Sequence, residues 1–87
     1  NVDLTKMTTT FETDAAETCT LPNGTSGQIK SFAMVTDNGD MVMTVTNPGW
    51  AASAKTITFS DIGDGCMLQF IGSKWYVIGN NGCTIES

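Results

Sequence analysis

The stretch FIGSKWYVIGNNG, residues 70–82, decides the fold. It holds two runs of β-branched and aromatic residues joined by Gly72–Ser73, and a glycine in first place favours a type II′ turn between hairpin strands. Side chains alternate between the faces of a strand, so Trp75 lies on one face of the second strand while Tyr76 and Ile78 share the other. Both faces are apolar, and a strand that is apolar on both faces is buried on both.

The strand before this turn, residues 66–71, has the same two-sided character, with Phe70 on one face and Met67 and Ile71 on the other. A chain of 87 residues buries only about 60 to 65 % of the surface that its unfolded form exposes, so it cannot supply two thick cores. The sequence therefore predicts that one side of the hairpin meets another subunit. The predicted subunit interface consists of Met67, Phe70, Ile71, Trp75, Tyr76 and Ile78.

Short runs rich in Val, Ile, Thr and aromatic residues continue from Thr18 to the end of the chain, separated by turn residues at intervals of about 8 to 12. This spacing is typical of an all-β domain, and no window has the periodicity of a helix. The predicted fold is a small antiparallel β-sandwich or barrel-like domain over residues 17–87, with about six or seven short strands. The strands are expected near residues 18–21, 27–36, 40–47, 55–60, 66–71, 74–79 and 83–86.

Two connections in this domain carry specific expectations. Asn38–Gly39 can take the positive φ values of a type I′ turn, which predicts a hairpin between the strand ending near Thr36 and the strand starting at Asp40. Residues 47–54, NPGWAASA, are predicted to form a longer loop because proline cannot donate to a strand ladder. Trp50 in this loop is interpreted as a packing or subunit-contact residue, with sugar stacking as the alternative.

Residues 1–16 differ from the rest of the chain because they are rich in Thr and acidic residues. Their apolar residues are Val2, Leu4, Met7 and Phe11, which are too few for a core. Val2 and Leu4 keep the two-residue spacing of a strand face. The segment is therefore predicted to be an extended N-terminal arm that becomes ordered against another molecule, with a flexible terminus as the alternative.

Cysteines and carboxylates are the candidate ligands of the sequence. Cys19, Cys66 and Cys83 form no short-spaced pattern and are predicted to be buried thiols, with one Cys19–Cys83 or Cys66–Cys83 disulfide as the alternative. No zinc site is expected, because the chain has no histidine and no CxxC. The carboxylate pairs of residues 37–40 and 61–65 have fewer ligands than a calcium loop and are predicted to form turns. We therefore expect no metal and no cofactor.

Composition argues against three broad classes of function. Four Lys, no Arg and nine acidic residues give a net charge of −5, whereas nucleic-acid binding needs clustered cations. No apolar run approaches the 18 or so residues needed to cross a bilayer, so no membrane partner is expected. Without His or Arg, the commonest general base and the usual anion clamp are missing, and the chain is predicted not to be an enzyme.

Four stretches in fixed order carry a family resemblance. They are LPNGTSGQIK at residues 21–30, GDMVMTVTN at 39–47, TITFSDIGDGCMLQF at 56–70 and KWYVIGNNG at 74–82. This order resembles a small β-rich module in virion structural proteins of tailed phages, especially those of marine bacteria and cyanobacteria. The resemblance covers about residues 18–85 and implies a homotrimeric β assembly on the capsid exterior or on an appendage of the virion.

The resemblance leads to two functional expectations. The first is a capsid decoration, or cement, protein: a trimer on the head lattice that stabilises it through multivalent contacts. In this interpretation Val2, Leu4, Met7 and Phe11 of the N-terminal arm contact the major capsid protein. The second is a trimeric module of a tail fibre, spike or head fibre, with a glycan or another receptor as its ligand.

Overall fold

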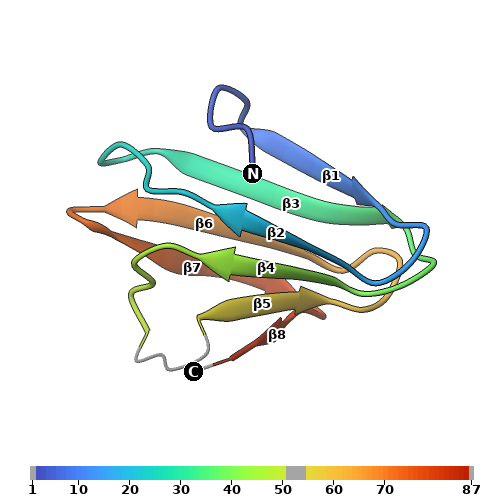
Figure 1. Ribbon diagram of the computed structural model, residues 1–87. Helices are drawn as coiled ribbons and strands as arrows, with labels where there is room; N and C mark the ends of the chain where they lie inside the picture. The colour runs from blue at the N-terminus through green and yellow to red at the C-terminus, as the bar shows by residue number, and fades with distance from the viewer. Residues whose placement is uncertain (1, 51–54, 87) are drawn as a thin grey trace.

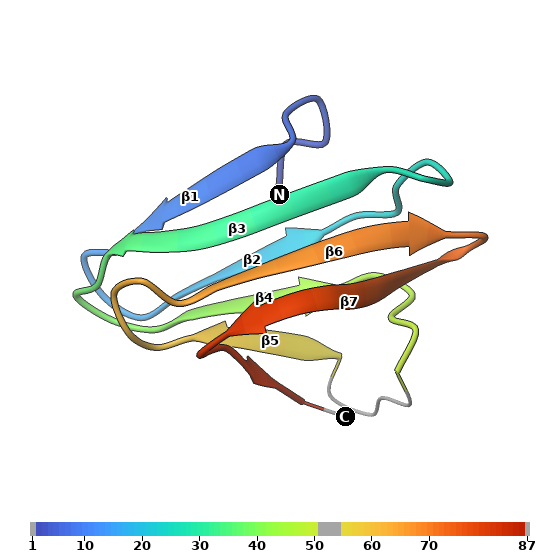
Figure 2. The ribbon, with the colours of Figure 1, turned by 180° about the vertical axis from the view of Figure 1, so that it is seen from behind.

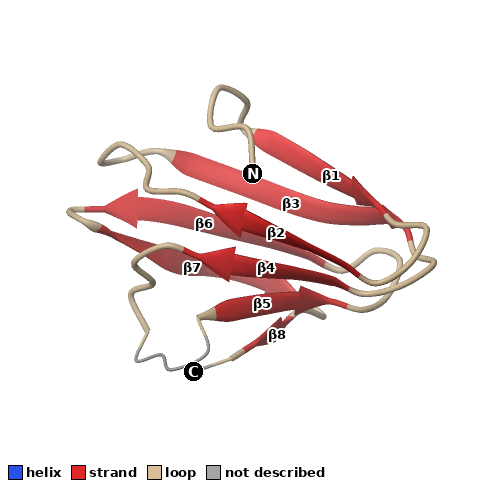
Figure 3. Ribbon diagram, viewed as in Figure 1, coloured by secondary structure: helices blue, strands red, loops and turns tan. Residues whose placement is uncertain are grey.

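Two four-stranded sheets pack face to face in the computed structural model, which describes residues 2–50 and 55–86 (Figure 1). One sheet has the strand order β1-β3-β6-β7 and the other has the order β2-β4-β5-β8. The strands are β1 (Thr8–Glu12), β2 (Glu17–Leu21), β3 (Ile29–Thr36), β4 (Met41–Val45), β5 (Thr56–Phe59), β6 (Gly65–Ile71), β7 (Lys74–Asn81) and β8 (Thr84–Ile85). Loops and turns make up the rest of the described chain, so the all-β prediction is confirmed (Figure 3).

The core lies between the two sheets and is built from the strand faces that alternation predicts. On β4 and β5 the inward residues are buried, while Val42 and the threonines between them face outward. Three phenylalanines stack in the middle: the Phe11 ring lies 5.0 Å from that of Phe59 and 5.9 Å from that of Phe32. The buried apolar residues are Val2, Phe11, Leu21, Phe32, Met34, Met41, Met43, Val45, Ile57, Phe59, Cys66, Leu68, Phe70, Trp75 and Cys83.

The predicted Gly72–Ser73 hairpin is confirmed. β6 and β7 are antiparallel, and Ile71 pairs with Lys74 across the turn. Gly72 has φ 66°, whereas Ser73 is not among the described residues with positive φ. One positive φ, at the first turn position, is the signature of a type II′ turn.

The predicted hairpin at Asn38–Gly39 is wrong, because β3 belongs to one sheet and β4 to the other. The apolar faces of β3 and β4 cover the core from opposite sides. The chain therefore crosses from one sheet to the other at residues 37–40. A Cβ atom on Gly39 would collide with the backbone of Ala15 and Ala16 in the neighbouring β1–β2 connection. The glycine therefore allows two crossing connections to pack closely.

The expectation of a wholly antiparallel sandwich is also corrected. β1 runs parallel to β3, and β2 runs parallel to β4 (Figure 2). The β1–β2 segment and the β3–β4 segment each cross from one sheet to the other in the same sense, and they lie side by side. The first half of the chain therefore supplies one edge of both sheets.

The N-terminal segment is part of this sandwich rather than a separate arm. Residues 8–12 form β1 in register with β3, and Phe11 is buried in the core. Val2 is also buried, and its N–H donates to the carbonyl oxygen of Thr20 at 2.9 Å. One large apolar residue is enough for β1, because only the face of this edge strand that points toward the core must be apolar.

A buried lysine fastens the loop that precedes β1. Lys30 on β3 is fully buried, and its ammonium donates to the carbonyl oxygens of Asp3 and Lys6 and to the hydroxyl of Thr9. The ammonium also lies 5.6 Å from the centre of the Phe32 ring. Burial lowers the pKa of this ammonium, because removal from water disfavours the charged form. Lys30 thus replaces the water that would otherwise solvate these carbonyl groups.

Candidate functional site: an apolar outer sheet face

The outer face of the β1-β3-β6-β7 sheet, on the side away from the core, carries five of the seven large apolar side chains that are exposed in the described chain. We call the residues that form it the outer patch. They are Val35, Met67, Ile71, Tyr76 and Ile78, and their side chains are between 36 and 50 % exposed. Exposed apolar surface that is concentrated on one face marks an interaction site more often than scattered apolar residues do.

Strand pairing brings most of the outer patch together. Met67 on β6 pairs with Gly79 on β7, so no side chain on β7 covers it there. Tyr76 pairs with Gln69 and packs its ring over Gly49 of the neighbouring loop. Ile78 occupies the extra position of a bulge in β7, beside Met67. Four of the patch residues therefore lie on the hairpin, and Val35 lies on the adjacent β3, beyond the last residue that pairs with β6.

Charge is absent from the middle of this face. The four strands contain three charged residues: Glu12 and Lys74 at strand ends, and Lys30, which points into the molecule. The cores of protein interfaces are depleted of charged residues in the same way, because desolvating an unpaired charge is unfavourable. A sheet face with charges only at its strand ends, in a chain of net charge −5, has the composition of a contact surface.

The structure divides the six residues that the sequence assigns to the subunit interface. Met67, Ile71, Tyr76 and Ile78 lie exposed in the outer patch. Phe70 and Trp75 are corrected: they face the core of their own chain, with exposed fractions of 5 % and 0 %. Alternation shows which residues share a face, but it does not show which face closes the core.

Three of the four predicted capsid contacts in the N-terminal segment are corrected in the same way. Val2 and Phe11 are buried in the core, and Leu4 packs against it. Only Met7, which is 58 % exposed, is free to meet another molecule. The segment therefore has no apolar stripe to offer to a capsid subunit.

The charges of the molecule are separated toward its two ends. β1, β3, β5 and β7 all start at one end, and a lysine stands at or near each of these starts (Figure 1). The opposite end of the molecule holds the β1–β2, β3–β4 and β5–β6 connections. Most of the carboxylates lie in these connections or at the strand ends beside them. Seven of the nine acidic residues belong to this end: Glu12, Asp14, Glu17, Asp37, Asp40, Asp61 and Asp64.

The carboxylates of the two predicted turns serve the backbone. Asp37 accepts a hydrogen bond from the N–H of Gly39, and Asp64 accepts from the N–H groups of Ser60 and Asp61. These contacts confirm the prediction that the aspartates form turns. Within the described residues, no group of three or more Cys, Asp or Glu side chains is placed to hold a metal ion.

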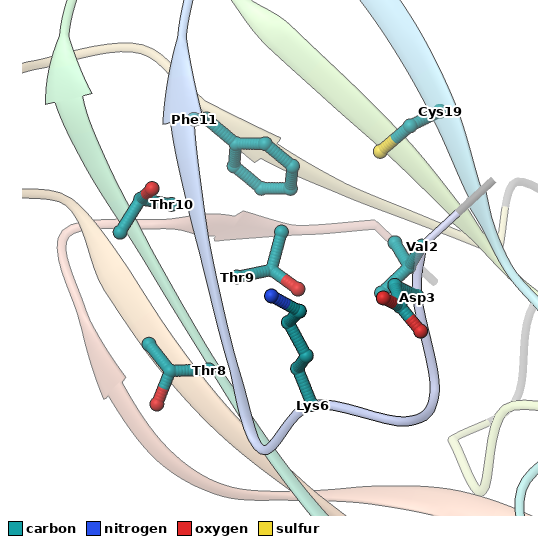
Figure 4. A pocket seen from close by; sticks show the side chains of 8 residues that line it. All are labelled: Val2, Asp3, Lys6, Thr8, Thr9, Thr10, Phe11 and Cys19. Carbon is teal, nitrogen blue, oxygen red and sulfur yellow. The ribbon is translucent and has the colours of Figure 1, made fainter.

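A pocket of about 440 Å³ opens between the N-terminal loop and the neighbouring strands β1 and β2 (Figure 4). The Lys6 side chain reaches toward Thr9, the Phe11 ring lies across from Cys19, and Asp3 forms the far wall. These side chains contribute one ammonium, one carboxylate and one thiol. The thiol has no histidine beside it, since the sequence contains none, so the pocket does not supply an activated nucleophile.

The remaining candidate residues have structural contacts. The indole N–H of Trp50 donates to the carbonyl oxygen of Glu86 at 2.7 Å and its ring packs against the core, as the packing interpretation predicts. All three cysteines are free thiols, two buried and Cys19 partly buried. A Cys19–Cys83 bridge is excluded in this fold, because β4 and β5 separate β2 from β8. Cys66 and Cys83 lie together.

We expect the Cys19 thiol to react only at high pH in the native protein. Burial raises its pKa from 9.0 to about 11, and only the thiolate is an effective nucleophile. The rate of alkylation by iodoacetamide should therefore rise up to about pH 11, whereas the rate for the unfolded chain should level off near pH 9. Mass analysis of the tryptic peptide of residues 7–30 measures both rates.

The same shift has a defined effect on stability. Below pH 9 the thiol is protonated in both states and the free energy of unfolding is unaffected. Between pH 9 and about 11 the unfolded state loses the proton first, so the Cys19 contribution to stability falls as the pH rises. Equal alkylation rates in the native and unfolded chains near pH 9 would contradict the burial of this thiol.

The described part of the chain contains no helix with the length and apolar character needed to cross a membrane. Comparison with protein-family models, with curated proteins and with solved structures finds no match to this chain.

Proposed function

We propose that this protein is a structural component of a tailed-phage virion, a capsid decoration protein that works as a homotrimer. The observation that carries the proposal is the outer patch: a group of exposed apolar side chains on one sheet face of a small acidic sandwich, with Lys74 as the charged residue at its hairpin end. Such a face suits permanent contact between subunits, because obligate interfaces resemble the apolar interior of a domain. The resemblance of residues 18–85 to virion modules supplies the biological setting.

The chemistry of the described residues agrees with a role in binding rather than catalysis. The cysteines are buried or partly buried, and the turn aspartates accept hydrogen bonds from backbone N–H groups. Trp50 packs its ring inward, which removes the main argument for sugar stacking. The proposed trimer uses the outer patch, and of the four N-terminal candidates only Met7 stays exposed for capsid contact.

Replacing Ile71 with aspartate is expected to convert the trimer to a monomer without unfolding it. Ile71 is 50 % exposed in the single chain, so a carboxylate there stays solvated in the monomer. In the assembly the carboxylate would have to leave water with only the cross-strand ammonium of Lys74 beside it, which disfavours association by about 3 kcal/mol and weakens it about 100-fold. Light scattering at micromolar concentration should show a mass of about 28 kDa, three times 9.2 kDa, for the wild type and 9.2 kDa for the variant.

Ile62→Asp is the matched control. Ile62 is more exposed than Ile71, at 66 %, but it lies in the β5–β6 connection outside the outer patch. This variant should remain trimeric. A monomeric wild type, or equal dissociation by the two substitutions, would remove the basis for the proposed assembly.

Binding to heads tests the function separately from the assembly. Purified protein should cosediment with heads that lack it, reach saturation and raise the temperature at which the heads release their DNA. The Ile71→Asp monomer should bind far more weakly, because each copy then holds the lattice alone. Mass spectrometry of separated heads and tails decides the location, and recovery with the tails alone would favour the fibre or spike alternative over decoration.

A further inference from the structure

The end of β7 and the loop that follows it bring two cysteines together. Cys66 pairs with Asn80 across the β6–β7 ladder, and two residues later Gly82 forms a backbone bridge with Gly65. Cys66 and Cys83 each follow one member of this bridge. Because Gly82 has φ 84°, a conformation that glycine adopts without strain, the chain can turn back beside β6 at this point.

Asn80 fixes the second cysteine in place. Its side-chain carbonyl accepts a hydrogen bond from the N–H of Cys83, and its side-chain NH₂ donates to the carbonyl oxygen of Cys83, both at 3.0 Å. Cys66 and Cys83 are 6 % and 8 % exposed and belong to the same core cluster. The two thiols lie close enough to perturb each other's pKa. Their approach is therefore set by backbone pairing and by Asn80 together.

We propose that Cys66 and Cys83 are a disulfide-forming pair, oxidised by a small disulfide such as glutathione disulfide, and that the bond cross-links the two sheets. Cys66 belongs to β6 of one sheet, whereas Cys83 leads directly into β8 of the other. β8 has only two residues, so little backbone pairing holds this edge of its sheet. A covalent bond there would fasten the last strand to the core.

The exchange needs no reagent beyond the small disulfide. The Cys83 thiolate attacks one sulfur of glutathione disulfide, breaking that bond, and the first glutathione leaves and takes up a proton. Cys66 then loses its proton and attacks the Cys83 sulfur, which expels the second glutathione. Two protein thiols are oxidised and one glutathione disulfide is reduced to two thiols.

The environment of the pair assigns the order of attack. The neighbouring Cys66 thiol lowers the pKa of Cys83, which agrees with Cys83 as the first thiolate. The same contact, together with burial, raises the pKa of Cys66. Local opening of the short β8 edge gives the small disulfide access to the pair, since Gly82 and Thr84 on either side of Cys83 are already exposed.

Tryptic mapping tests the proposal directly, because Lys74 separates the two cysteines. The folded protein is incubated with glutathione disulfide, its remaining thiols are blocked, and it is then digested. We expect a cross-linked product of residues 56–74 and 75–87 that separates on reduction, while residues 7–30 carry the blocked Cys19. A cross-link to residues 7–30, glutathione adducts alone, or bonds only between chains would overturn the proposal.

A thermal measurement tests the structural consequence. The bond closes a loop of about 17 residues and should raise Tm by roughly 10 to 20 °C, because it removes conformations from the unfolded chain. Cys19→Ser should keep this response, and Cys83→Ser should lose it. If Cys83→Ser does not fold, the wild-type peptide map still decides whether the bond forms, and an oxidised wild type with unchanged Tm would refute the cross-link between the sheets.

Discussion

Trp75→Ala is expected to lower the free energy of unfolding by about 3 to 5 kcal/mol, the range measured when large aromatic residues are removed from cores. Trp75 is fully buried, packs edge-on against Phe70 with ring centres 5.1 Å apart, and donates from its indole N–H to the carbonyl oxygen of Pro22 at 2.9 Å. Alanine would leave a cavity and an unpaired carbonyl. Because a domain of this size has roughly 4 to 13 kcal/mol in total, a large share of stability is lost.

Chemical denaturation measures the free energy of unfolding of Trp75→Ala, and Tyr76→Ala is the matched control. The two aromatic residues are adjacent but lie on opposite faces of β7, and Tyr76 is 40 % exposed. Tyr76→Ala should cost less than about 1 kcal/mol in the monomer. If Trp75→Ala instead dissociated an assembly and left the monomer as stable as before, Trp75 would lie at a subunit contact, as the sequence alone predicts.

Lys30→Met is expected to cost about 2 to 4 kcal/mol, although methionine keeps much of the aliphatic volume. Replacing buried ions by apolar residues is often harmless when both partners are replaced. Here the partners are the backbone carbonyls of Asp3 and Lys6, which no substitution removes. Each unsatisfied group costs about 1 to 3 kcal/mol, and the penalty is limited because the loop can open to water.

Hydrogen exchange shows which part of the chain is destabilised in Lys30→Met. In Lys30→Met, the amides of residues 3–10 should lose protection while those of β6 and β7 keep theirs until global unfolding. Lys74→Met is the control, because Lys74 is exposed at the hairpin and its replacement should change stability by less than about 0.5 kcal/mol. Equal stability of Lys30→Met and the wild type would show that the ammonium does not hold the N-terminal loop.

Much of the second half of the fold was predictable from sequence, because its signals are local. Alternation predicts the inward faces of β4, β5 and β6, and Gly72–Ser73 specifies its turn through one positive φ. The turn at Asn38–Gly39 has equally suitable residues but joins two sheets. Its geometry depends on the close approach of Ala15, a contact 24 residues away in the chain that no local pattern contains.

The place of the N-terminal segment is hard to predict from sequence for a related reason. β1 contributes a single large apolar residue, Phe11, and its partner strand follows about 20 residues later. Lys30 adds to the difficulty, since lysine is almost never fully buried and a sequence offers no sign that backbone carbonyls will surround it. The sequence predicts the four outer-patch residues of the hairpin as exposed contacts, but it does not separate them from Phe70 and Trp75. Both faces of the hairpin are apolar, and packing alone decides which face closes the core.

Because the lysines and most of the carboxylates lie toward opposite ends, the net charge does not describe the electrostatic field that an approaching molecule meets. The molecule extends 35, 27 and 21 Å along its principal axes, and the Debye length at physiological ionic strength is about 8 Å. A partner near one end therefore feels little of the field from the other. In dilute salt the protein should orient as a dipole, and at physiological ionic strength an approaching molecule should respond mainly to the charges of the end that it meets.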